Sequence, residues 1–305
     1  MDAITKELLV QTSDLHAIPQ GAYNIRKDGK LLSRNCSQEI QIVSKQDRDG
    51  IDIIIAPNTK NQSVHIPVVI TQGGLNDLVY NDFYIGENCD VLIVAGCGIH
   101  NDSEQSSTHN GIHTFHIGKN AKVRYVEKHL GLGQTNSGKI LNPTTEVHMD
   151  EQSYFEMETV QLGGVTYSDR KTNAVLQANA TLIINEKILT TDTQRAMTNF
   201  NVELVGENSK VEVTSRSVAQ NDSFQEFNSN IIGKAKCFGH VECDGIISDR
   251  AIINSTPKIS AQDVNAMLVH EAAIGKISED QIIKLMTLGL TQEEAEKQII
   301  SGFLS

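Results

Sequence analysis

The sequence predicts a mainly β protein built as a β-solenoid, with a short helix near its N-terminus and two short helices at its C-terminus. Three observations lead to this fold class. Apolar residues alternate, or run together over strand lengths, from about residue 38 to residue 260. A short motif recurs through the same region. From residue 278 onward the apolar residues recur with the spacing of a helix instead.

Residues 1–20 contain one expected helix, because Asp2 can cap it and Ile4, Leu8 and Leu9 give it an apolar side. The stretch GAYNIRKDGK that follows is typical of a strand between two turns. We therefore expect three parts: a helix and lead-in strand over residues 1–37, a solenoid core over 38–262, and a helical segment over 263–305.

The recurring motif consists of a turn, a small residue, one further residue and an apolar pair. A period of this size is typical of solenoids and propellers, whose repeats are too thin to fold alone and are stabilised by stacking. The chain has no WD or kelch signature, and its β-branched residues argue against helical repeats. A β-sandwich with repetitive turns is the alternative. The aligned small residues, separated by 32, 32, 27, 29 and 26 positions, are Cys89, Ala121, Ser153, Ala180, Ser209 and Ala235.

Two helices of about 10 residues close the chain as an αα-hairpin. Ser278 and Gln281 form the pattern of a capping box, Gly289 is a helix stop, and Thr291 with Glu294 repeats the capping pattern. The apolar residues expected on one side of each helix are Ile282, Leu285 and Met286 in the first, and Ala295, Ile299, Ile300 and Phe303 in the second.

The composition excludes several classes of function. A net charge of −12 disfavours binding to nucleic acid. The absence of Trp and an aromatic content of 5% predict a shallow core of Val, Ile and Leu, and leave few platforms for sugars. No apolar run approaches about 18 residues, so no membrane span is expected. Five cysteines, an odd number without a visible signal peptide, predict reduced thiols in the cytoplasm.

The stretch CFGHVECDG, residues 237–245, carries the first candidate chemistry. As a strand it would turn Cys237 and Cys243 to one face, the solenoid interior. In a straight strand these two residues would lie about 20 Å apart, too far for one ion. They could share a site only if the chain turned between them, or each could be completed by other coils or another subunit. The alternative is that both only fill the core.

Two other stretches of the sequence could provide metal-ligating residues. Cys97 lies between Gly96 and Gly98, and glycines allow a backbone or a ligand to approach closely. Four histidines follow it, and we interpret them as solvated loop residues: His100, His109, His113 and His116. His270 and Glu271 lie between apolar residues and would be costly to bury unless paired or bound to metal. A charge cluster at a helix entry is the alternative for that pair.

The stretch CFGHVECDGIISDRAII and the later HEAAIGKISEDQIIKLMTLGLTQEEAEKQIISGFL resemble the C-terminal signature of the SufB/SufD family. These proteins are scaffolds of the Suf iron–sulfur cluster assembly system. GIDIIIAPNTKNQSVHIPVVIT and VAGCGIHN resemble its short, single-type members. The family fold is a right-handed parallel β-helix with a C-terminal helical segment, which agrees with the repeat.

The resemblance implies a transient iron–sulfur cluster, for which thiolates are the expected ligands. The essential cysteine of the pattern falls on Cys243, and the glutamate of its H-E-A motif on Glu271, beside His270. Cys237 and Cys97 are further candidates. Asp102 stands where a second cysteine is expected after AGCGIHN, and the sulfur-receiving cysteine of longer members has no counterpart, so the sulfur route is unassigned.

The resemblance also implies partners rather than an enzymatic activity. A Suf-type ABC ATPase would dock on the C-terminal helices, and the ATP hydrolysis would be its own. A single-type scaffold would form a homodimer, take sulfur from a donor and pass the cluster to apo recipient proteins. A β-helix carbohydrate-active enzyme and a purely structural interaction module are the alternatives. The residues expected to contact the ATPase are Leu285, Met286, Leu288, Ile299 and Phe303.

Overall fold

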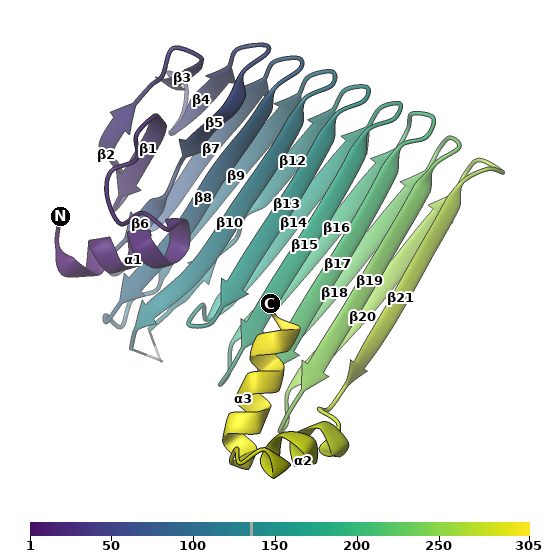
Figure 1. Ribbon diagram of the computed structural model, residues 1–305. Coiled ribbons are helices and arrows are strands. Elements are labelled where there is room, and N and C mark those ends of the chain that lie inside the picture. The colour runs from purple at the N-terminus through teal and green to yellow at the C-terminus, as the bar shows by residue number, and fades with distance from the viewer. Residues whose placement is uncertain (135–136) are drawn as a thin grey trace.

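The chain folds as a flattened β-solenoid in which two sheets face each other, shown by a computed structural model that describes residues 1–134 and 137–305 (Figure 1). Successive long strands alternate between the sheets, so strands that are neighbours in one sheet are usually two apart in sequence. Their pairing is parallel from β4 and β5 onward, which excludes the sandwich alternative and confirms the expected solenoid.

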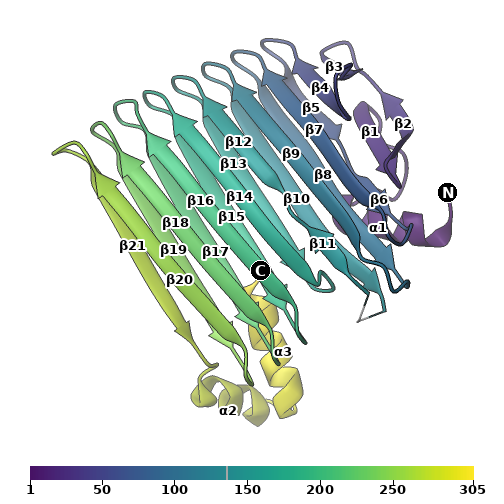
Figure 2. The same ribbon diagram turned by 180° about the vertical axis from the view of Figure 1, so that it is seen from behind.

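Sheet A and sheet B are the names used below for these two layers, seen from opposite sides in Figures 1 and 2. In spatial order, sheet A contains β2 (Lys30–Asn35), β1 (Ala22–Lys27), β5 (Lys60–His65), β6 (Val68–Ile70), β8 (Asp90–Asn101), β10 (Lys122–Gly133), β13 (Tyr154–Leu162), β15 (Thr181–Thr190), β17 (Lys210–Ala219), β19 (Phe238–Ile247) and β21 (Met267–Gly275). Sheet B contains β3 (Ile40–Ser44), β4 (Gly50–Ile55), β7 (Asn76–Ile85), β9 (Ser107–Ile117), β11 (Lys139–Leu141), β12 (Thr144–Met149), β14 (Tyr167–Leu176), β16 (Arg195–Leu204), β18 (Phe224–Gly233) and β20 (Ile252–Ala261).

The recurring motif forms the turns that carry the chain from sheet B to sheet A. An Asn such as Asn88 or Asn120 adopts a positive φ at the turn, and the small residue after it points inward. Cys89, Ala121, Ser153, Ala180 and Ser209 are all buried. The last position of the alignment was wrong. The β17–β19 register pairs Lys210 with Phe238, so Cys237 rather than Ala235 follows Ser209 in this row.

The interior contains more aromatic packing than the composition suggested. Phe83 and Phe115 are fully buried with ring centroids 4.4 Å apart, and Phe155 and Tyr125 each lie 5.0 Å from Phe115. Parallel in-register strands place side chains of neighbouring coils directly over one another. A few aromatic residues at matching positions therefore form a continuous ladder.

The N-terminal helix α1 (Ala3–Ser13) begins at Asp2, whose side chain accepts a hydrogen bond from the backbone amide of Thr5 (2.8 Å), as expected. It packs on the outer face of β8. A Cβ on Gly96 would lie 2.4 Å from the Thr12 carbonyl, and one on Gly98 would lie 2.8 Å from the Leu8 side chain. The glycines that flank Cys97 therefore allow a helix, rather than a ligand, to approach the strand.

The C-terminal hairpin consists of α2 (Glu279–Thr287) and α3 (Gln292–Phe303), which lie beside the last coils (Figures 1 and 2). Thr291 and Glu294 form the expected capping box. The capping box expected at Ser278 was wrong, because its side chain makes no capping hydrogen bond. The strand β21 also lies within residues 263–305 and pairs in parallel with β19. Among the described helices, none combines the length and apolarity needed to cross a membrane.

Candidate functional site

Cys243 lies on β19, the strand next to the edge of sheet A, and its side chain points into the solenoid interior. Strand β19 turns alternate side chains inward, and the Cys243 side chain is fully buried between Ser215 of β17 and Ala272 of β21. Burial raises the pKa of its thiol to about 11. Cys243 is therefore protonated at neutral pH, and it would have to lose that proton to bind a metal ion.

His270 and Glu271 lie on β21, the edge strand of sheet A, and point to opposite faces. His270 pairs with the inward residue Val241, so it shares the inner face with Cys243. Both ring nitrogens of His270 are shielded from solvent and form no hydrogen bond with any described residue. Glu271 pairs with Glu242 on the outer face, where its carboxylate is 3.8 Å from the His240 imidazole and its side chain is 67% exposed.

Within one protomer, the structure thus places Cys243 and His270 on the same inner face of sheet A, and directs Glu271 to the outer face. Cys237 is buried at the turn before β19, where its sulfur lies near Gly233. Strand β19 is continuous, so the separation of about 20 Å expected between the two cysteines applies. Residues 1–134 and 137–305 contain no group of three or more His, Cys, Asp or Glu residues able to hold a metal ion.

Cys97 lies in a separate interior cluster. Its thiol is buried beside a cavity of about 20 Å³ that is also lined by His109, His113, Glu127 and His129. Burial raises the pKa of Cys97 well above its ordinary value, and the nearby carboxylates Asp77 and Glu127 act in the same direction. A cavity of this size holds about one water molecule.

The interpretation of the nearby histidines as solvated loop residues was wrong. Strand β9 carries His109 and His113 into the interior, where they are 6% and 7% exposed. The His109 Nδ1 atom is 2.9 Å from the Asp77 carboxylate, and the His113 Nδ1 atom is 2.9 Å from the Tyr125 hydroxyl. Gly111 indicated a loop, but it is an inward position of the strand that leaves room for both imidazoles.

Comparison with known proteins identifies the family. The family model described as "SUF system FeS cluster assembly, SufBD core domain" matches residues 80–303. The chain belongs to the SufBD family. A relative from Archaeoglobus fulgidus, named an iron-sulfur cluster assembly SufBD family protein, is 29% identical over 90% of this chain and 73% of its own length. One of the same description from Methanocaldococcus jannaschii is 27% identical over 93% and 90%.

This SufBD protein also has a buried ionic network that the sequence reasoning missed. Arg170 of β14 forms an ion pair with Glu127 of β10, contacts the His129 imidazole at 3.2 Å and approaches Glu186 of β15 at 3.7 Å. Glu186 accepts hydrogen bonds of 2.9 Å from Thr198 and from Ser215. The strand alternation in KVRYVEKH could have revealed it, since it places Glu127 on the same face as Val123 and Tyr125.

The network shifts the pKa values of two buried carboxylates in this SufBD protein, those of Glu127 and Glu186. Burial alone would raise the pKa of Glu127, but Arg170 and His129 outweigh this and hold it well below its ordinary value. Burial raises the pKa of Glu186, and Arg170 offsets only part of that effect. Because Ser215 is the register partner of Cys243, the network reaches the strand next to the candidate thiol.

The residues expected to contact a partner have different surroundings in this SufBD protein. Met286 and Leu288 of the α2 region are 43% and 79% exposed, and α2 buries none of its residues. Leu285 and Ile299 are half-buried. Phe303 faces the solenoid, where its ring lies 5.8 Å from the Arg216 guanidinium and its carbonyl accepts a hydrogen bond of 3.1 Å from the same side chain.

Proposed function

We propose that this SufBD protein is a cytoplasmic scaffold on which an iron–sulfur cluster is assembled, and from which the cluster passes to recipient proteins. The observation that carries the proposal is the placement of Cys243 and His270 on one interior face at the open end of the solenoid. Thiolate and imidazole are suitable ligands for iron. Its relatives are named for iron–sulfur cluster assembly, which supports the same role.

One protomer provides too few ligands on that face, so we propose that the cluster forms where two protomers meet. Strands β20 and β21 end sheets B and A, and their outer edges are unpaired among the described strands. Large apolar side chains are exposed beside them: Ile252 is 53%, Ile259 47% and Met267 60% exposed. An open solenoid end of this kind requires a cap. A second protomer related by a twofold axis would also contribute a second copy of each ligand residue.

The protein should therefore sediment as a homodimer. Replacing the exposed Met267 and Ile259 by Lys should shift it toward the monomer, because charges would then be buried at the junction. Leu31 and Leu32, 50% and 44% exposed near the opposite end, provide the control pair. Sedimentation velocity of the three proteins checks this, and a monomeric parent protein would contradict it.

We propose that an ABC ATPase docks on the C-terminal hairpin. Ile283 and Met286 are 56% and 43% exposed on α2, a helix with no buried residue, and Leu288 at its C-terminal cap is 79% exposed. An amphipathic helix of this kind suits a groove on a partner. ATP hydrolysis in that partner could then move the hairpin relative to the last coil.

Replacing Leu288 by Glu should weaken ATPase binding by about 30-fold or more, as expected for loss of a central apolar contact. Ile18→Glu is the matched control, since Ile18 is also well exposed (58%) but lies near the other end of the chain. Calorimetric titration with a purified Suf-type ATPase measures both affinities. Equal affinities in the two variants would place the ATPase elsewhere.

A further inference from the structure

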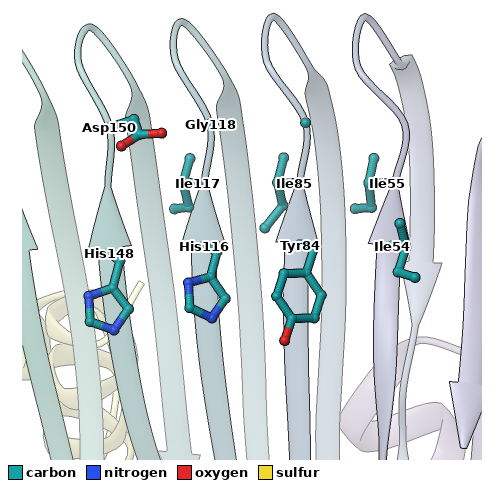
Figure 3. Close-up of a pocket in the computed structure, with 10 residues that line it drawn as sticks. Ile54, Ile55, Tyr84, Ile85, His116, Ile117, Gly118, His148 and Asp150 are labelled. Atoms are coloured by element: carbon teal, nitrogen blue, oxygen red, sulfur yellow. The ribbon is translucent and has the colours of Figure 1, made fainter.

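The outer face of sheet B carries a row of side chains that the proposed scaffold function does not use. Ile54, Tyr84, His116 and His148 occupy matching positions on β4, β7, β9 and β12. Figure 3 shows these four side chains side by side on neighbouring strands, close to the turns that lead to sheet A. They line a surface hollow of about 390 Å³ together with Asp150.

The two imidazoles in this row are close together and unengaged. Their ring centroids are 5.3 Å apart, with an angle of 14° between the ring planes. Tyr84 lies on the other side of His116 with its ring centroid at 5.0 Å, so the His116 ring has a neighbour on both sides. Neither His116 nor His148 makes a hydrogen bond or an ion pair with any residue that the structure describes, whereas the interior His109, His113 and His129 all do.

We propose that His116 and His148 together bind one divalent transition-metal ion on the outer face of sheet B. Imidazole is a preferred ligand of Zn²⁺, Ni²⁺ and Cu²⁺, with metal–nitrogen distances for zinc of about 2.0–2.1 Å. Strands in a sheet lie about 4.8 Å apart, so the two imidazoles can each direct one nitrogen at a common ion once their rings rotate out of the near-parallel arrangement. His148 is exposed and His116 half-buried, so such an ion can reach them from solvent.

The site would consist of the two imidazoles and water. The described residues provide no third protein ligand, so water completes the coordination. A site with two imidazoles exchanges its ion readily, and it is separate from Cys243.

Calorimetric titration with Ni²⁺ tests the proposal. The titrated protein is free of metal and carries the Cys36→Ser substitution, so that the exposed thiol of Cys36 cannot bind Ni²⁺. It should bind one equivalent of Ni²⁺ at this site. His116→Phe and His148→Phe keep a ring in the row but remove its nitrogens, and each should weaken binding by about 10²-fold because the second contact is intramolecular.

His16→Phe is the matched control, because His16 is exposed and lies outside the row. Its Ni²⁺ affinity should equal that of the parent. Circular dichroism checks that each variant is folded, and His148→Gln provides a second replacement if the Phe variant is not. Unchanged Ni²⁺ affinity in the folded His116 and His148 variants, or an equal loss in the His16 variant, would overturn the proposal.

Discussion

Replacing Arg170 by Met should lower the free energy of unfolding by about 3–5 kcal/mol, because the substitution leaves a buried carboxylate without its partner. The Arg170 side chain is only 6% exposed, and its ion-pair partner Glu127 is 4% exposed. Glu127 would keep its contact with the His129 imidazole, at 3.4 Å. Urea unfolding followed by circular dichroism measures the change.

The pH dependence of this loss tests its cause. Arg170 and His129 hold the pKa of Glu127 below its ordinary 4.5 against the effect of burial, so in the parent protein this residue stabilises the fold above that pH and ceases to do so on acidification. Without Arg170, burial would raise the pKa of Glu127. The cost of the substitution should therefore be largest near neutral pH and shrink as the pH falls and Glu127 becomes protonated.

Two further variants separate the buried charge from a general effect of losing an arginine. Adding Glu127→Gln to Arg170→Met should recover part of the stability, because the unpaired charge is then gone. Arg250 pairs with Asp222 at 2.6 Å, but its side chain is 81% exposed. Arg250→Met should change stability little, since exposed ion pairs contribute little. Equal losses for Arg170→Met and Arg250→Met would contradict the role given to burial.

The solenoid could be predicted because its signals are local and repeated. In the first five copies the turn has a residue with a positive φ followed by a small residue, such as Asn120 with Ala121, and both leave a mark in the sequence. The alignment failed by two residues at Ala235, where no Asn marks the turn. Where the local signal was absent, only the pairing of neighbouring strands fixed the position of Cys237.

The interior chemistry was harder to predict because it depends on which strands face one another. Glu127, Arg170 and Glu186 come from three different strands, β10, β14 and β15, and only the pairing of these strands brings them together. Single-strand alternation correctly placed Cys243 inside. It could not relate Cys243 to Glu271, because the relative register of β19 and β21 decides which of His270 and Glu271 shares its face.

Replacing Cys243 by Ser should abolish reconstitution of an iron–sulfur cluster, because a buried hydroxyl is a poor substitute for a thiolate ligand. The fold should survive, since Ser215 already occupies the matching position on β17. Anaerobic reconstitution with iron and sulfide, followed by Mössbauer spectroscopy, measures the bound cluster. A Cys243→Ser protein that binds as much iron and sulfide as the parent would contradict the ligand assignment.

Cys89→Ser is the matched control for this experiment. The Cys89 thiol lies 3.2 Å from the Ala56 carbonyl of the preceding coil, whereas Ser153 and Ser209 donate to carbonyls of their own turns, those of Asp150 and Gly206, at 2.6 and 2.7 Å. Serine thus already occupies the position of Cys89 in two other turns, so cluster binding should be unchanged in Cys89→Ser. Cys36→Ser, at the exposed cysteine, should likewise leave cluster binding unchanged.

The same measurement distinguishes the two candidates on β21. If the cluster forms on the inner face, His270→Ala should reduce the bound iron strongly, because His270 shares that face with Cys243. Glu271→Gln should then leave assembly intact and alter at most retention or transfer, since its carboxylate lies on the outer face beside His240. A full loss of cluster in Glu271→Gln, with His270→Ala unaffected, would instead require Glu271 to reach the cluster from the outer face, for example across the junction of two protomers.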